Sequence, residues 1–126
     1  MFNVKSLLLI FIMITSGVAQ ESLSGVYLTE DGSTQMEVFE QEGMVYGKVK
    51  HSTKQQAPVG ELVLIDFVRE GAKWEGKLHA IAKGKYFDAS LRKRVNGLEI
   101  TIYQGRFKKT VVWSRVGNDM SIPGDV

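Results

Sequence analysis

Apolar and polar residues alternate with a period of two along most of the chain after residue 20. Residues 73–80 read KWEGKLHA and residues 97–103 read GLEITIY, so that every second position is apolar or small. A β-strand points successive side chains to opposite faces, and this alternation is typical of a strand with one dry and one wet face. No segment after residue 20 has the period of a helix. The pattern predicts eight strands, at residues 24–29, 34–41, 44–51, 61–69, 73–80, 85–93, 97–103 and 108–116.

Short turns join these predicted strands. Asn96-Gly97 is the strongest signal for a two-residue hairpin, and other glycine-containing pairs lie between the remaining alternating runs. Only residues 52–60 form a longer polar link. Eight consecutive strands joined by hairpins predict an all-β fold, an antiparallel up-and-down barrel that leaves no exposed edge. A two-sheet β-sandwich is the alternative.

Two of the predicted strands are apolar on both faces. The strand at 61–69 is broken only by Asp66, and the strand at 108–116 is apolar on both faces near Val111-Val112-Trp113. Such strands are either covered on both sides or in contact with a partner. An inward Asp66 would be desolvated and its pKa raised, whereas the simpler reading puts it on the solvent face or beside a lysine. The same two readings, a polar outer face or a polar pocket wall, hold for Asp88.

Residues 1–19 form a predicted secretory signal. One basic residue, Lys5, precedes an apolar run from Leu7 to Ile14, and Gly17 and Ala19 supply small residues at positions −3 and −1 of a cleavage site before Gln20. The run is too short to span a bilayer as a helix, although an uncleaved anchor or a buried helix is the alternative reading. Cleavage leaves 107 of the 126 residues as one domain, residues 20–126. We therefore expect a periplasmic or secreted protein with no transmembrane span.

Composition adds two limits to this picture. The chain has no cysteine, so it can form neither a disulfide nor a lipid-modified N-terminal cysteine. Residues 20–75 hold ten acidic and five basic residues, while residues 76–126 hold four acidic and ten basic ones. This asymmetry indicates either an anionic partner or, as the interleaving with strand patterning favours, two differently charged sides of one barrel. A net charge of +2 gives little drive for nucleic-acid binding, and we expect none.

The order of several short motifs resembles a known family. These motifs are Gly25-Val26-Tyr27 with Glu30-Asp31-Gly32, Val45-Tyr46-Gly47-Lys48-Val49, Trp74-Glu75-Gly76-Lys77-Leu78, Gly84-Lys85-Tyr86, Asn96-Gly97-Leu98 and Trp113-Ser114-Arg115-Val116. In this order they resemble the small secreted bacterial proteins grouped as domain of unknown function 2147. The resemblance spans Ser24 to Val116 and implies a lipocalin-like barrel of unestablished function.

The resemblance also suggests roles for Tyr27 and Arg115. Lipocalin-like barrels often pair a Gly-x-Trp on the first strand with an arginine on the last, whose guanidinium covers the aromatic ring and closes the base of the barrel. Gly25-Val26-Tyr27 and Arg115 are placed to do this here. The alternative is that Arg115 binds an anionic ligand.

Catalytic and metal-binding patterns are sparse in this sequence. His51 and His79 are the only histidines, they fall on different predicted strands, and neither lies in a metal-binding spacing. No Gly-x-Ser-x-Gly motif occurs. We therefore expect no metal, no cofactor and no catalytic residues, and an enzymatic function is the weakest of the alternatives.

A binding function rests on the aromatic residues. An eight-stranded barrel is either filled by side chains or holds one small ligand. The sequence therefore predicts a binding module for a small apolar or amphipathic molecule, with an envelope protein-interaction or structural module with a filled barrel as the alternative. The candidate ligand-binding residues are Tyr27, Trp74, Tyr86, Tyr103, Trp113 and Arg115.

Overall fold

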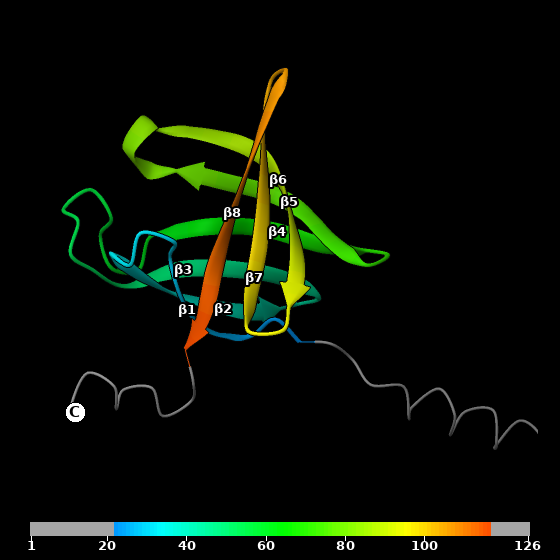
Figure 1. The fold of residues 1–126 in the computed structure, drawn as a ribbon, viewed down its shortest axis with the longest axis horizontal. Helices are drawn as coiled ribbons and strands as arrows, with labels where there is room; N and C mark the ends of the chain where they lie inside the picture. Colours follow the sequence, from blue (N-terminus) through cyan, green and yellow to red (C-terminus); the bar gives the residue numbers. More distant parts are fainter. Residues whose placement is uncertain (1–21, 117–126) are drawn as a thin grey trace, which may run out of the picture.

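The computed structural model describes residues 22–116, which form one closed antiparallel barrel (Figure 1). Its strands are β1 (Gly25–Leu28), β2 (Thr34–Gln41), β3 (Met44–Ser52), β4 (Leu62–Glu70), β5 (Lys73–Ala80), β6 (Lys85–Arg94), β7 (Gly97–Gln104) and β8 (Phe107–Val116). All eight predicted strands are confirmed, with ends that shift by at most one residue. The sandwich alternative is wrong because β8 pairs with β1 and closes the wall. The predicted signal and its cleavage site lie outside the described residues.

The connections between strands alternate between the two ends of the barrel. The turns after β2, β4 and β6 lie at the end where β1 begins and β8 finishes, which we call the closed end. The links after β1, β3, β5 and β7 lie at the other end, which we call the open end, and the link after β5 contains a single 3-10 turn, η1 (Ile81–Lys83). Figure 1 shows the β7–β8 hairpin extending past its neighbours.

Two turns illustrate how local sequence sets the hairpins. Glu42 and Gly43 have φ of 52° and 81°, and positive φ at both positions is the requirement of a type I′ hairpin. The prediction for Asn96-Gly97 is shifted by one residue, since the loop is Val95-Asn96 and Gly97 already pairs with Arg94 as the first residue of β7. Gly97 is needed for another reason, because a Cβ there would overlap the carbonyl oxygen of Trp113 on β8.

A β-bulge in β4 decides which side chains of that strand enter the barrel. Pairing with β5 shifts between Ile65 and Val68, and Asp66 has a positive φ of 52°. The extra residue breaks the alternation, so that Leu64 and Phe67, three positions apart, are both fully buried. Gly76 lies opposite the bulge, where a Cβ would stand 2.7 Å from the Phe67 ring and from the Ile65 carbonyl oxygen.

The seam between β1 and β8 is short. Only Val26, Tyr27 and Leu28 pair with β8, at Val116, Arg115 and Ser114. Among the described residues, no strand pairs with Phe107–Trp113 on the β1 side. The barrel wall is therefore open along this part of β8, toward the open end.

One hydrophobic core occupies the interior of the barrel. Its largest fully buried side chains are Tyr27, Phe67, Leu23, Met36, Leu64, Leu91, Leu98 and Ile100. Leu23 comes from the segment before β1 and Phe67 is turned inward by the bulge, while the other residues occupy the inward positions that the alternation in the sequence predicts. Within residues 22–116, no helix has the length and apolar character that crossing a membrane requires.

Candidate functional site

The base of the barrel is sealed by the segment before β1. Leu23 is fully buried, and the Tyr27 hydroxyl donates a hydrogen bond of 2.8 Å to the Leu23 carbonyl oxygen. Arg115 Nη1 donates to the Tyr27 hydroxyl at 3.1 Å, and its Nη2 donates to the Ser24 carbonyl oxygen at 2.9 Å. The guanidinium also lies over the place where Gly25 would carry a Cβ, 2.8 Å away. These contacts agree with the base-closing role proposed for Arg115.

Burial changes the chemistry of Tyr27. Desolvation raises the pKa of its phenol above the ordinary value near 10, and the nearby Arg115 guanidinium opposes this rise. The phenol is therefore neutral at physiological pH. Its hydroxyl links Leu23, in the segment before β1, to Arg115 through hydrogen bonds. Tyr27 lines neither of the two cavities described below.

Trp74 lies at the same closed end of the barrel. Its ring is buried, and the Arg69 guanidinium carbon lies 4.7 Å from the ring centre. The neighbouring outer surface is basic, because Arg92, Lys93 and Arg94 from the positively charged half of the sequence lie there. Trp74 is thus part of the packing of the closed end.

The open end of the barrel holds an apolar cup. It has a volume of about 240 Å³. Its apolar lining is Met36, Val49, Ala57, Val63, Ile81, Ala82 and Trp113, and its polar rim is Thr29, Thr34, Lys54, Gln56 and His79. The cup combines strand residues of the wall with residues from the 52–60 link and the β5–β6 link. It is the largely apolar concavity with a few polar groups that small-molecule sites typically present.

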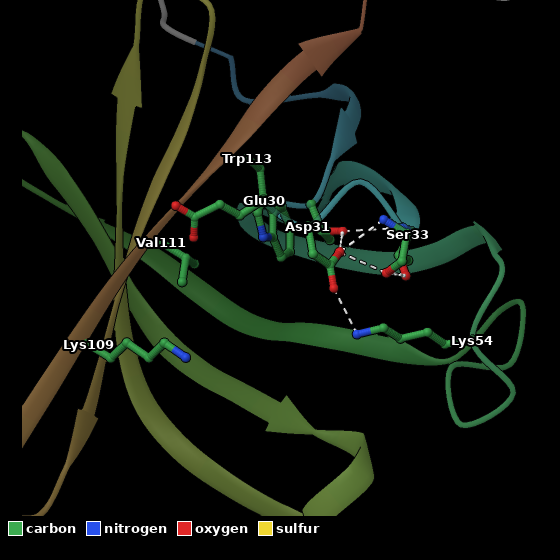
Figure 2. Close-up of a pocket in the computed structure, with 9 residues that line it drawn as sticks. Glu30, Asp31, Ser33, Lys54, Lys109, Val111 and Trp113 are labelled. Atoms are coloured by element: carbon green, nitrogen blue, oxygen red, sulfur yellow. Dashed lines mark hydrogen bonds and ion pairs between the residues drawn. The ribbon is translucent and has the colours of Figure 1, made fainter. Parts of the chain in front are cut away.

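A second cavity adjoins the cup through shared lining residues, among them Thr29, Lys54 and Trp113. It has a volume of about 300 Å³ and lies where the β1–β8 seam is open, between the β1–β2 turn and β8. We call it the lateral opening. Its remaining lining is Glu30, Asp31, Ser33, Thr34, Lys109 and Val111 (Figure 2). Trp113 lines both cavities, so the lateral opening and the cup adjoin at its side chain.

Asp31 organises the edge of the lateral opening. Its carboxylate accepts hydrogen bonds from Lys54 Nζ at 2.8 Å, from the Ser33 backbone N–H at 2.9 Å and hydroxyl at 2.8 Å, and from the Thr29 hydroxyl at 2.9 Å. The bond from Lys54, followed by those from Ser33 and Thr29, holds the pKa of Asp31 well below its ordinary value of 3.8. The ionised Asp31 thereby ties the β1–β2 turn to the 52–60 link.

Lys109 extends from β8 into the lateral opening, as Figure 2 shows. It pairs with Ile102, while Val111 pairs with Ile100 and Trp113 with Leu98. Directly opposed residues share a face of the sheet, and Leu98 and Ile100 are buried in the core. Lys109 is therefore on the inner face of β8, nearer the open end than Val111 and Trp113.

Two of the predicted ligand-binding residues lie away from these cavities. Tyr86 is 60% exposed and stacks on His79, with ring centres 4.4 Å apart. Tyr103 is on the outer face, where its hydroxyl is 3.3 Å from the Ser90 hydroxyl. The structure brings Tyr27 together with Arg115 at the base and brings only Trp113 of the six to the cup.

Asp66, Asp88 and His79 each have a separate partner. Asp66 is exposed at the bulge and accepts a hydrogen bond of 2.8 Å from the Tyr46 hydroxyl, so the solvent-face interpretation is confirmed. Asp88 is also exposed and pairs with Lys77 at 2.6 Å. His79 Nδ1 lies 3.7 Å from a Glu61 carboxylate oxygen. Within the described part of the chain, no three His, Cys, Asp or Glu residues are placed to hold a metal.

Sequence reasoning missed most of the cup. The contributions of Ala57 and Ile81 depend on how two links fold over the open end, and no sequence period reports this. Lys109 could have been found, because it alternates in phase with Val111 and Trp113. This alternation is hard to recognise in the sequence because Val112, on the other face of β8, is also apolar.

Comparison with known proteins supports the fold. No protein-family model and no curated protein sequence matches the chain, so the resemblance to domain of unknown function 2147 stays a prediction. A solved structure described as protein HP1028 from the human pathogen Helicobacter pylori, belonging to the lipocalin family, is similar, with a TM-score of 0.68 and 21% identity. The match covers 83% of this chain and 89% of that one. The chain therefore has a lipocalin-like barrel fold.

Proposed function

We propose that this protein is an exported binding module whose cup holds one small apolar or amphipathic molecule. The observation that carries the proposal is the apolar cup at the open end of a barrel whose other end is sealed by Leu23 and filled by the core. A rigid wall with an apolar interior is already formed for a ligand, so little ordering is needed on binding. A predicted signal at residues 1–19 supports a periplasmic or extracellular site of action.

The size of the cup restricts the ligand. Its volume of about 240 Å³ is below the range of roughly 300–1,000 Å³ typical of pockets for drug-sized molecules. Met36, Val49 and Trp113 belong to the buried core and also line the cup, so the core forms its floor and a long chain has no room to extend inward. The ligand class is therefore a molecule with a short apolar chain or a single small ring system.

Calorimetric titration of the protein with decanol tests the proposal. Ala57→Trp should abolish binding, because Ala57 lines the cup and the new ring would occupy it. Val59→Trp is the matched control, since Val59 is in the same link, is 72% exposed and does not line the cup. Unchanged decanol affinity in the Ala57→Trp protein, or no binding by the wild-type protein, would rule the cup out as the site.

A further inference from the structure

The inner face of β8 carries one positively charged side chain next to two apolar ones. Lys109, Val111 and Trp113 share that face and all line the lateral opening. Two residues along a strand span about 7 Å. The backbone positions of Lys109, Val111 and Trp113 are therefore roughly equally spaced. From the open end toward the cup they carry an ammonium group, a small aliphatic side chain and an indole ring.

The two lysines of the lateral opening differ in their partners. Lys54 is paired with Asp31 at 2.8 Å. Within residues 22–116, Lys109 forms no ion pair and no side-chain hydrogen bond. Its charge is therefore free to pair with a ligand, whereas that of Lys54 is already compensated.

The acidic residues of the opening do not supply the missing partner. Asp31 already accepts four hydrogen bonds, including the one from Lys54. Glu30 lies in the β1–β2 turn, and Figure 2 shows its carboxylate on the β8 side of the opening, but within residues 22–116 it forms no ion pair with Lys109. Of the charged side chains here, only Lys109 lies on the barrel wall in line with the apolar lining.

We propose that the ligand of the cup is an amphiphile with an anionic head, a carboxylate or a phosphate monoester, which pairs with Lys109 while its short apolar chain lies against Val111 and Trp113. This inference rests on the proposed function of the cup. A hydrogen bond between an ammonium and an anion is stronger than one between neutral groups, so Lys109 selects the head while the cup selects the chain. The lateral opening lets the head remain in contact with water.

Four probes with the same chain separate the contributions of head and tail. Decanoate, decyl phosphate, decanol and decylammonium are titrated into the wild-type protein by calorimetry at low ionic strength. We expect the better of the two anions to bind about tenfold more tightly than decanol, and decylammonium to bind more weakly than decanol. The ratio between decanoate and decyl phosphate decides which anionic head the site takes. The preference should shrink at high salt because the pair is exposed to solvent.

The matched variants are Lys109→Gln and Lys108→Gln. Lys108 is the neighbouring residue on the same strand, it opposes Tyr103 on the outer face, and it does not line the lateral opening. Both substitutions remove one positive charge from the same edge, so general charge effects are equal. We expect Lys109→Gln to remove the preference for the anions over decanol, while Lys108→Gln keeps the preference.

The possible failures are distinguishable. Equal affinity of the wild-type protein for decanoate, decyl phosphate and decanol would overturn the role of Lys109 and leave the proposed function intact. Decylammonium binding as tightly as decanoate, or an equal loss of preference in both variants, would also overturn it. Absence of binding for all four probes would overturn the proposed function itself.

Discussion

The guanidinium carbon of Arg115 on β8 lies 5.5 Å from the centre of the Tyr27 ring on β1, and Arg115 Nη1 also donates a hydrogen bond of 3.1 Å to the Tyr27 hydroxyl. The two residues are opposed in the register between the first and last strands. The Arg115 side chain thus joins the seam between β1 and β8 to the segment before β1 that seals the base of the barrel. Side-chain contacts at the closed end add to the three residue pairs of the short seam.

Arg115→Ala should lower the stability of the protein without affecting the cup. The change removes the hydrogen bonds to the Tyr27 hydroxyl and the Ser24 carbonyl oxygen. We expect a loss of about 1–2 kcal/mol, which corresponds to a drop in Tm of roughly 5–15 °C for a domain of this size. Thermal unfolding followed by circular dichroism measures it. Arg106→Ala, in the exposed β7–β8 turn, is the control and should leave Tm nearly unchanged.

An unchanged Tm in Arg115→Ala, combined with loss of decanoate binding, would contradict the base-closing role. It would favour the other reading of Arg115, in which the guanidinium binds an anionic ligand. The distance of Arg115 from the cup makes this a sharp distinction, because Arg115 lines neither the cup nor the lateral opening.

Gly76→Ala should be strongly destabilising for a residue on a strand. The added Cβ would stand 2.7 Å from both the Phe67 ring and the Ile65 carbonyl oxygen, and the backbone atom cannot move without disturbing the bulge. Overpacking of this kind costs about 1–3 kcal/mol. Urea unfolding measures the loss, with Lys77→Ala on the adjacent outward position as the control. A Gly76→Ala protein as stable as the wild type would show that the bulge is free to shift.

Replacing Asp66 with asparagine should leave the stability of the protein nearly unchanged, whereas replacing it with valine should lower the stability. Its φ of 52° lies in the left-handed region, which asparagine adopts readily and a β-branched residue does not. The asparagine side chain would also keep an oxygen to accept the hydrogen bond from Tyr46. We expect Asp66→Asn to unfold at nearly the wild-type urea concentration, and Asp66→Val to lose about 1–2 kcal/mol of stability. Equal stability of the two variants would mean that the bulge does not require this backbone conformation.

The same bulge shows where prediction from the sequence reaches its limit. Alternation locates all eight strands, because most of them have one face in the core and one in water. In β4 a strict period of two puts Asp66 on the same face as Leu64, whereas the structure turns Asp66 outward and Phe67 inward. A single inserted residue reverses which face the later side chains of the strand occupy. The insertion is seen only in the structure, in the shifted pairing with β5, the positive φ of Asp66 and the close contact with Gly76.

The candidate site was less predictable than the fold for a related reason. Tyr86 precedes Phe87, which pairs with the inward Leu78, and Tyr103 follows the inward Ile102, so the alternation already places both tyrosines on the outer face. The prediction of a binding role for them rests on their being aromatic. The cup depends on the shortness of β1 and on the path of residues 52–60, and neither leaves a periodic trace in the sequence. Facing along a strand is a local property, whereas a cavity is a property of the ends of several strands together.

The ion pair between Asp31 and Lys54 should make the rim of the lateral opening sensitive to acid. Folding lowers the pKa of Asp31 below its ordinary value of 3.8, so its contribution to stability is complete above that pH and is lost as the pH falls through the lowered pKa. The Thr53 backbone N–H, which donates to the Ser33 carbonyl oxygen at 3.0 Å, reports on the rim. Its amide signal should shift in an acid titration by NMR, and this step should be absent in Asp31→Asn.

Asp31→Asn should also change ligand binding at neutral pH, in the direction opposite to Lys109→Gln. Without the carboxylate, the ammonium of Lys54 loses its partner at 2.8 Å and becomes available to a ligand in the same opening as Lys109. The opening then carries one more uncompensated positive charge, so decanoate should bind severalfold more tightly while decanol affinity stays constant. Weaker decanoate binding in Asp31→Asn would mean that the ordered rim matters more to the site than its charge, because the substitution loosens the β1–β2 turn as well as freeing Lys54.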